Sequence, residues 1–159
     1  MNHIFVKTLL PFAILLGLVA LFISKNAEST PVVKTENAIR WLSFEEATRL
    51  AEKEKKPILI NVYAEWSGGC KKMEAETFSK PAIIAYINTH YYAVRLNAES
   101  NRKIQFDESE IGSQQLAQHI FKVNSYPSMV YINRDRVMTT VPGYQNSQDF
   151  EMYLRYFGK

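Results

Sequence analysis

Apolar residues in this chain fall into short runs separated by segments with helical periodicity. The runs 58–64 and 91–96 are short and rich in β-branched and aromatic residues, which is typical of strands buried on both faces. The runs 128–132 and 137–141 flank a polar turn and predict an antiparallel hairpin. Because a helical pattern separates the first two runs, we expect a right-handed βαβ unit with a parallel pair of strands.

Helical patterns surround these strands. Ser43, with Glu46 three residues later, forms a capping box that predicts a helix ending near Lys55. Further helices are expected at 70–78, at 82–88 after Pro81, at 113–121 and at 148–157, the last capped by Ser147 and ended by Gly158. Residues 97–112 are polar and acidic without a clear period, so we expect an insertion or long loop there.

The N-terminal segment has the pattern of a targeting sequence. Residues 8–23 carry no charge and follow the basic Lys7, which is the layout of a secretory signal or a signal anchor. Residues 4–6 extend this run toward the roughly 20 apolar residues that a spanning helix needs. We therefore expect the chain to meet a membrane through residues 4–23.

The possible cleavage sites favour an anchor over a cleaved signal. Cuts after Ser24 or Ala27 would place Phe22 or Lys25 three residues upstream, where a small side chain is needed. We divide the chain into a signal peptide or membrane anchor at 1–27, a tether at 28–42 and a folded domain at 43–159. The domain is expected outside the cytoplasm, anchored to the membrane, or secreted if the signal is cleaved.

Composition and charge narrow the classes of function. The chain has 159 residues, of which 47% are hydrophobic, enough for one domain with a real core. The net charge of the chain is +3, and the sequence shows no clustered basic face of the kind that nucleic-acid binding needs. Nucleic acid is therefore not expected as a partner. Cys70 is the single cysteine, and with three scattered histidines it offers no metal-ligand spacing. We expect no metal and no cofactor.

The residues before Cys70 suggest a family. Residues 56–70 read Lys-Pro-Ile-Leu-Ile-Asn-Val-Tyr-Ala-Glu-Trp-Ser-Gly-Gly-Cys. This segment resembles the thioredoxin-like family, in which an apolar strand leads through Ala-Glu-Trp into Cys-Gly-Pro-Cys. Residues 71–74 resemble the secreted branch that includes reductase domains of periplasmic disulfide-exchange systems. Residues 123–131 resemble the family's cis-proline loop, and 142–144 its closing strand. The resemblance implies an α/β thioredoxin fold, with a central mixed sheet flanked by helices, over about residues 43–157.

The same comparison shows where the chain departs from the family. There, the first cysteine of the pair attacks a disulfide from a helix N-terminus, the second resolves the mixed disulfide, and a buried acid assists the second. Here Ser67 stands at the first cysteine, Gly69 at the proline and Asn61 at the acid. A serine hydroxyl forms no disulfide, and asparagine is not a general base. We therefore expect a redox-impaired relative of the thiol–disulfide oxidoreductases.

The resemblance also implies a binding groove. In the family, a cis bond before the proline, here Pro127, leaves the preceding backbone free to pair with an extended chain. Trp66 and Tyr126 are expected to flank this groove, and Gly68, Gly69 and Pro127 are expected to take part in binding. The partner would be a protein or peptide outside the cytoplasm.

Three functions stay open at this point, so whether the chain is an enzyme is undecided. In the first case the chain is a redox-impaired binding protein, in which Cys70 is a small shielded core residue. Alternatively, it is a monothiol oxidoreductase whose Cys70 forms mixed disulfides with glutathione or a partner cysteine. In the third case it is an ordinary two-cysteine oxidoreductase that carries an engineered Cys-to-Ser change at 67.

Overall fold

The computed structural model describes residues 37–159. These residues belong to one compact unit. The predicted signal peptide or anchor at 1–27, including the expected span at 4–23, lies outside them. Among the helices of residues 37–159, none combines the length and the apolar character that crossing a membrane requires.

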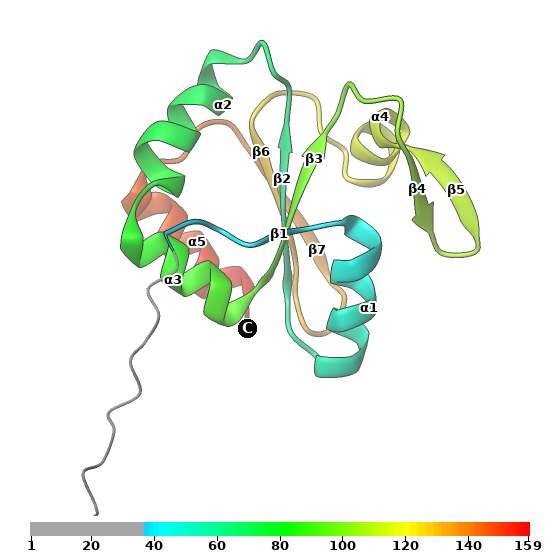
Figure 1. The fold of residues 1–159 in the computed structure, drawn as a ribbon, viewed down its shortest axis with the longest axis horizontal. Helices are drawn as coiled ribbons and strands as arrows, with labels where there is room; N and C mark the ends of the chain where they lie inside the picture. Colours follow the sequence, from blue (N-terminus) through cyan, green and yellow to red (C-terminus); the bar gives the residue numbers. More distant parts are fainter. Residues whose placement is uncertain (1–36) are drawn as a thin grey trace, which may run out of the picture. The chain divides into compact units, whose positions relative to one another are not determined.

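A five-stranded mixed sheet forms the centre of the domain (Figure 1). In spatial order its strands are β1 (Trp41–Leu42), β3 (Tyr92–Asn97), β2 (Ile58–Tyr63), β6 (Ser128–Ile132) and β7 (Met138–Pro142). The first three are parallel, whereas β6 and β7 are antiparallel to their neighbours. The predicted parallel pair and the predicted hairpin are therefore confirmed, and with them the α/β class.

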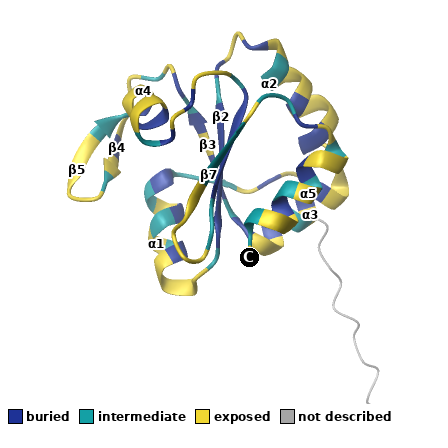
Figure 2. Ribbon diagram, turned by 180° about the vertical axis from the view of Figure 1, so that it is seen from behind, coloured by how far each residue is buried: buried dark blue, intermediate teal, exposed yellow. Residues whose placement is uncertain are grey.

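Helices cover both faces of the sheet. One face carries α1 (Phe44–Glu54), the short α4 (Ser113–Gln115) and η2 (Leu116–Ile120); the other carries α2 (Gly68–Met73), η1 (Glu74–Phe78), α3 (Pro81–His90) and α5 (Ser147–Phe157). Side chains of β2 alternate between the two cores, with Ile60 on the α1 side and Leu59 on the α3 side. Figure 2 shows this buried sheet between layers whose outer faces are exposed.

The segment 97–112 is not the long loop that its polarity suggested. After β3 ends at Asn97, the strands β4 (Lys103–Phe106) and β5 (Ser109–Gly112) pair as a separate antiparallel hairpin. Ile104 is buried in the α1-side core, and Phe106 stacks on Phe44 with ring centroids 6.0 Å apart. Only one face of the hairpin is apolar. The exposed residues between the apolar ones are polar, and they obscure the two-residue alternation that would have predicted these strands.

The expected tether at 28–42 also needs correction at its C-terminal end. Ile39 is buried, and β1 pairs in parallel with β3 through Trp41 and Leu42. The side chain of Asn88 in α3 holds this entry, because its Oδ1 accepts from Arg40 N at 2.9 Å. The domain therefore begins before Ser43. A two-residue strand is too short to produce a period that sequence patterns reveal.

The helix caps are partly as predicted. Ser43 caps α1, since its Oγ accepts from Glu46 N at 3.1 Å. At the last helix, however, Asn146 is the cap instead of Ser147, and its Oδ1 accepts from the backbone N–H groups of Gln148 and Asp149. Both residue types are good caps, so the pattern alone favours neither position.

Buried tyrosines predict how stability depends on pH. Burial raises the pKa of Tyr131 and of Tyr91, whose hydroxyl also donates to the Leu154 carbonyl. Below pH 10 both phenols are neutral in the folded and unfolded chain, so stability there does not depend on them. Above pH 10 only the unfolded chain releases these protons, so the free energy of unfolding should fall by up to about 1.4 kcal/mol per pH unit for each tyrosine. Urea unfolding at pH 8 to 11 measures this, and Tyr131→Phe should reduce the slope; an equal slope in that variant would contradict the assignment.

Candidate functional site

The motif Ser67-Gly68-Gly69-Cys70 lies at the end of β2, where the chain turns into α2 (Figure 1). The turn is closed by Ser67 N, which donates to Ala64 O at 3.2 Å. Ser67 is the N-cap of α2, and its Oγ accepts from Cys70 N at 3.3 Å. The residue at the expected first-cysteine position therefore stabilises the helix start.

Both hydrogen-bonding functions of the Ser67 hydroxyl are used. Besides accepting from Cys70 N, Ser67 Oγ donates to the Tyr126 carbonyl at 3.1 Å. The side chain is only 5% exposed. A nucleophilic serine needs a base that accepts its proton, and here a backbone carbonyl holds that proton. The geometry makes Ser67 a link between the motif and the loop before β6.

The two glycines of the motif occupy different surroundings. A Cβ on Gly69 would lie 3.0 Å from Pro127 Cδ and 3.5 Å from the Tyr126 carbonyl oxygen, whereas a Cβ on Gly68 would meet nothing within 4 Å. The bond between Tyr126 and Pro127 is cis. Gly69 thus packs directly on the proline loop, and Gly68 faces open space.

This difference gives a matched pair of variants. Alanine is a better helix former than glycine by about 0.5–1 kcal/mol, so both substitutions gain similarly from α2. Gly69→Ala must also displace the ring of Pro127, and we expect it to be at least about 1 kcal/mol less stable than Gly68→Ala. Urea unfolding of the two variants compares them directly. Equal stabilities would show that the contact between residue 69 and Pro127 is loose.

Trp66 and Tyr126 lie together beside the motif. Their rings meet edge to face, with centroids 6.0 Å apart. Trp66 is 67% exposed, and its Nε1 donates to Glu99 Oε1 at 2.8 Å. Burial raises the pKa of Tyr126, and the carboxylate of Glu99 adds to this effect. An exposed aromatic surface held in place by a hydrogen bond is thus available next to Pro127.

Asn61 lies on β2, before the motif in the chain. It is 3% exposed, pairs in register with Arg95 on β3, and its Oδ1 has no hydrogen-bond partner within residues 37–159. Asn61 is thus in the buried position where the family resemblance implies an acid. Its carboxamide supplies no proton acceptor of the kind that a thiol needs for deprotonation.

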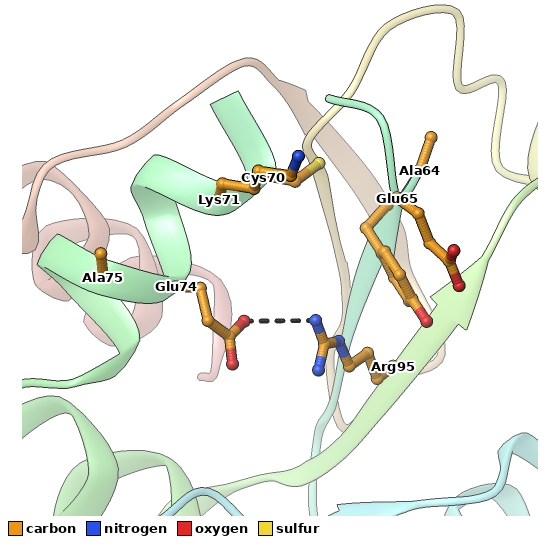
Figure 3. A pocket seen from close by; sticks show the side chains of 8 residues that line it. Ala64, Glu65, Cys70, Lys71, Glu74, Ala75 and Arg95 are labelled. Atoms are coloured by element: carbon orange, nitrogen blue, oxygen red, sulfur yellow. Dashed lines mark ion pairs between the residues drawn. The ribbon is translucent and has the colours of Figure 1, made fainter. Parts of the chain in front are cut away.

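Cys70 is half-buried, with a free thiol, and lines a pocket of about 560 Å³ (Figure 3). The pocket lies between the start of α2 and the ends of β2 and β3, and is lined by Tyr63, Ala64, Glu65, Cys70, Lys71, Glu74, Ala75 and Arg95. Glu74 and Arg95 form an ion pair of 3.5 Å across it, and the Arg95 guanidinium lies 4.5 Å from the ring centre of Tyr63. Cys70 is therefore not the fully shielded residue that one interpretation of the sequence expected.

The structure brings together all the residues predicted for the site and adds others. Glu99, Glu74 and Arg95 were missed because their contacts join segments far apart in the chain. Two signals were present in the sequence. Glu74 follows Cys70 by four residues and so lies on the same helix face, and Arg95 is the one charge in an otherwise apolar strand.

A curated relative matches part of the chain. The thiol:disulfide interchange protein DsbD of Vibrio vulnificus is 34% identical over 67 residues, which are 42% of this chain and 11% of that protein. The DsbD protein of a second strain of Vibrio vulnificus matches equally. The chain thus corresponds to a small part of the length of these relatives.

Solved structures show the same fold at low sequence identity. The DsbH oxidoreductase has a TM-score of 0.58 at 18% identity, covering 83% of this chain and 92% of its own. A thioredoxin from Thermus thermophilus has a TM-score of 0.59 at 17% identity, covering 75% and 86%. The C-terminal domain of DsbD from Neisseria meningitidis has a TM-score of 0.54 at 14% identity, covering 74% and 99%.

A family model decides the assignment. The model for the thioredoxin-like domain matches residues 44–158, which is most of the described domain. The overall fold, with its mixed central sheet, agrees with the solved structures just described. The chain therefore belongs to the thioredoxin-like family.

Proposed function

We propose that this protein is a redox-impaired thioredoxin-like protein that binds an extended polypeptide partner beside Pro127, outside the cytoplasm. The observation that carries the proposal is the state of Ser67. Its hydroxyl occupies the position of the missing nucleophile, and both of its hydrogen bonds hold the motif to the Tyr126 carbonyl and to α2. A two-thiol cycle needs an attacking thiolate at this position and has none here.

The groove offers backbone and aromatic contacts for such a partner. The backbone N–H of Tyr126 donates no hydrogen bond to any residue of the described part of the chain. An extended partner can accept from this N–H, as in strand addition. The exposed ring of Trp66, next to Tyr126, supplies an apolar surface for the partner's side chains.

Glu99 and Glu65 give the groove a chemical preference. Glu99 holds the indole of Trp66, and Glu65, directly before Trp66, is exposed. The Glu99 carboxylate lies at the aromatic surface and Glu65 lines the adjoining Cys70 pocket, so a partner segment that combines apolar and basic side chains fits best. Location outside the cytoplasm, and attachment to the membrane through residues 4–23, are part of the proposal and rest on the N-terminal sequence pattern.

The test combines two measurements on the full chain. We expect no reduction of insulin above background, because no second thiol resolves a mixed disulfide. Alkylation of Cys70 in the folded protein should be slow compared with the unfolded protein, because the thiol is half-buried at the end of the pocket. Turnover comparable to that of a two-cysteine thioredoxin would overturn the proposal.

One observation favours a second function, a monothiol oxidoreductase. Cys70 is half-buried instead of fully shielded, and it lines an open pocket through which a disulfide of a small molecule or a partner could reach its thiol. In this alternative the Cys70 thiolate attacks a disulfide, forms one mixed disulfide and releases one thiolate. Fast alkylation of folded Cys70, together with capture of a mixed disulfide, would support this function against the binding role. An engineered origin of Ser67 is decided by the sequence of the native gene.

A further inference from the structure

The strand register gathers three chain segments at the end of the domain opposite the motif. Ile58 at the start of β2 pairs with Tyr92 at the start of β3 and with Ile132 at the end of β6, which pairs with Met138 of β7. The segments 52–57 and 133–137 therefore lie at the same end of the sheet. Residues 155–159 join them, because Arg155, Gly158 and Lys159 line a common pocket with Arg134. This end is the lower part of Figure 1.

Positive charge is concentrated in these three segments, which we call the basic end. The expectation that basic residues form no cluster therefore needs correction, because the three segments lie far apart in the chain and only the fold brings them together. Its basic side chains are Lys53, Lys55, Lys56, Arg134, Arg136, Arg155 and Lys159, and its acidic ones are Glu52, Glu54 and Asp135. Two of the basic side chains are ion-paired: Arg136 with Glu52 at 3.6 Å, and Arg155 with Glu151, one turn earlier on α5, at 2.7 Å. Glu54 accepts from the Tyr92 hydroxyl. Basic side chains still outnumber acidic ones at this end when Glu151 is included. In the remainder of residues 37–159, acids slightly outnumber bases. The described domain is therefore electrically polarised along the sheet.

Exposed aromatic and apolar side chains lie on α5 next to the basic end. Tyr156 is 69% exposed and Met152, four residues earlier on the same helix face, is 54% exposed. The neighbouring Arg155 lies over the ring of Tyr86, with 4.6 Å to its centre. Basic residues beside exposed tyrosine are the combination found where proteins meet the headgroup region of a bilayer.

The chain also enters the domain beside the basic end. Asn88, in the last turn of α3, donates from Nδ2 to the Ala38 carbonyl at 3.0 Å, and its own carbonyl accepts from Lys56 Nζ at 3.3 Å. Asn88 thus connects Ala38, near the start of the described residues, with Lys56 of the basic end. The position of this connection bears on membrane docking only through the proposed anchor at 4–23, whereas the charge and the aromatic residues do not depend on that anchor.

We propose that the basic end is a docking surface for the anionic headgroups of a phospholipid bilayer, which directs the Ser67–Cys70 motif away from the membrane. The bilayer is the occupant that fits, because several lysines and arginines on loops and helix ends act together on a surface of uniform charge. Each such residue near an anionic bilayer strengthens binding by a factor of about five.

Hydrogen–deuterium exchange of the full chain tests this docking. The chain is mixed with vesicles of phosphatidylcholine alone, or of phosphatidylcholine with about one third phosphatidylglycerol. We expect amide exchange at 133–137 and 153–159 to be slower by about tenfold or more in the anionic vesicles, and this difference to disappear in high salt. Insertion of an anchor occurs in both lipid mixtures, so it does not produce the difference.

Charge reversals provide the matched control. Lys53→Glu/Arg134→Glu should abolish the slowing, whereas Lys80→Glu/Lys122→Glu, at exposed positions outside the basic end, should leave it intact. Equal exchange in both lipid mixtures, or slowing that persists in Lys53→Glu/Arg134→Glu, would overturn the proposal. The insulin assay is independent of lipid, so failure of docking and failure of the proposed function are distinguishable.

Discussion

Replacing Ser67 by cysteine is expected to convert the protein into a working, though slow, disulfide reductase. The new thiol would stand at the N-cap of α2, where the backbone N–H of Cys70 now donates to Ser67 Oγ. Positive potential at a helix start lowers the pKa of a thiol. The introduced thiolate would then attack a disulfide of insulin and release one thiolate. Cys70 would resolve the mixed disulfide, releasing the second thiolate and leaving a disulfide between residues 67 and 70, which the dithiothreitol of the assay reduces again. We expect insulin reduction to rise about a hundredfold above the background of the unaltered chain.

Asn61 determines how far this recovery goes. It is buried on β2 and is not a general base, and a general base contributes about 10²–10⁴-fold to a rate. Ser67→Cys/Asn61→Asp should therefore be at least about tenfold faster than Ser67→Cys alone. Asn61→Asp alone is the matched control and should be inactive. A Ser67→Cys variant that forms no disulfide between residues 67 and 70 and reduces no insulin would contradict this prediction. It would show that the serine at position 67 does not by itself explain the loss of reductase activity.

Substitution of Trp66 should have the second largest effect, on binding of polypeptide. An unfolded protein that has been reduced and S-alkylated is a suitable probe, because it contains no reactive thiol. Trp66 is mostly exposed, so Trp66→Ala removes the aromatic surface without opening a cavity in the core. Aromatic anchors of this kind contribute about 2 kcal/mol or more, so the Kd should rise about thirtyfold, measured by fluorescence anisotropy.

Two controls separate the groove from the thiol. Cys70→Ala should bind the alkylated probe with unchanged affinity, because no covalent bond is involved. Met152→Ala alters an exposed side chain on α5, away from the groove, and should also leave the Kd unchanged. Equal binding by Trp66→Ala and the unaltered chain would place the binding surface elsewhere.

Much of the fold could be predicted from local patterns in the sequence. The strands β2, β3 and β6 are mostly apolar runs, which can be recognised without knowing which helices cover them. The capping interaction at Ser43 joins residues within one helical turn, so it is also visible in the local sequence. β1 and the hairpin β4–β5 could not be predicted in the same way. Two residues in β1 give no period, and the hairpin buries only Ile104 fully, so its stability comes from tertiary packing on Phe44.

Part of the candidate site could likewise be predicted from the sequence, and part could not. Ser67, Gly69, Cys70 and Trp66 are contiguous, so the motif identified them together. The partners that define their environment come from other segments. The contact of Ser67 with the Tyr126 carbonyl joins residues 59 positions apart, and the bond from Trp66 to Glu99 joins residues 33 apart. Only the pairing of β2 with β3 and β6 brings such segments together, and local sequence patterns do not show which distant strands become neighbours.

The thiol state of Cys70 in the living cell tests the central claim most directly. The full chain is recovered from its own cells after acid quenching and alkylation, and is then run on a gel without reductant. We expect one alkylated thiol per chain and no adduct that reductant disperses, because binding beside Pro127 needs no covalent bond. A reductant-sensitive complex that is present in the unaltered chain and absent from Cys70→Ala would contradict this account and establish Cys70 as a reactive monothiol.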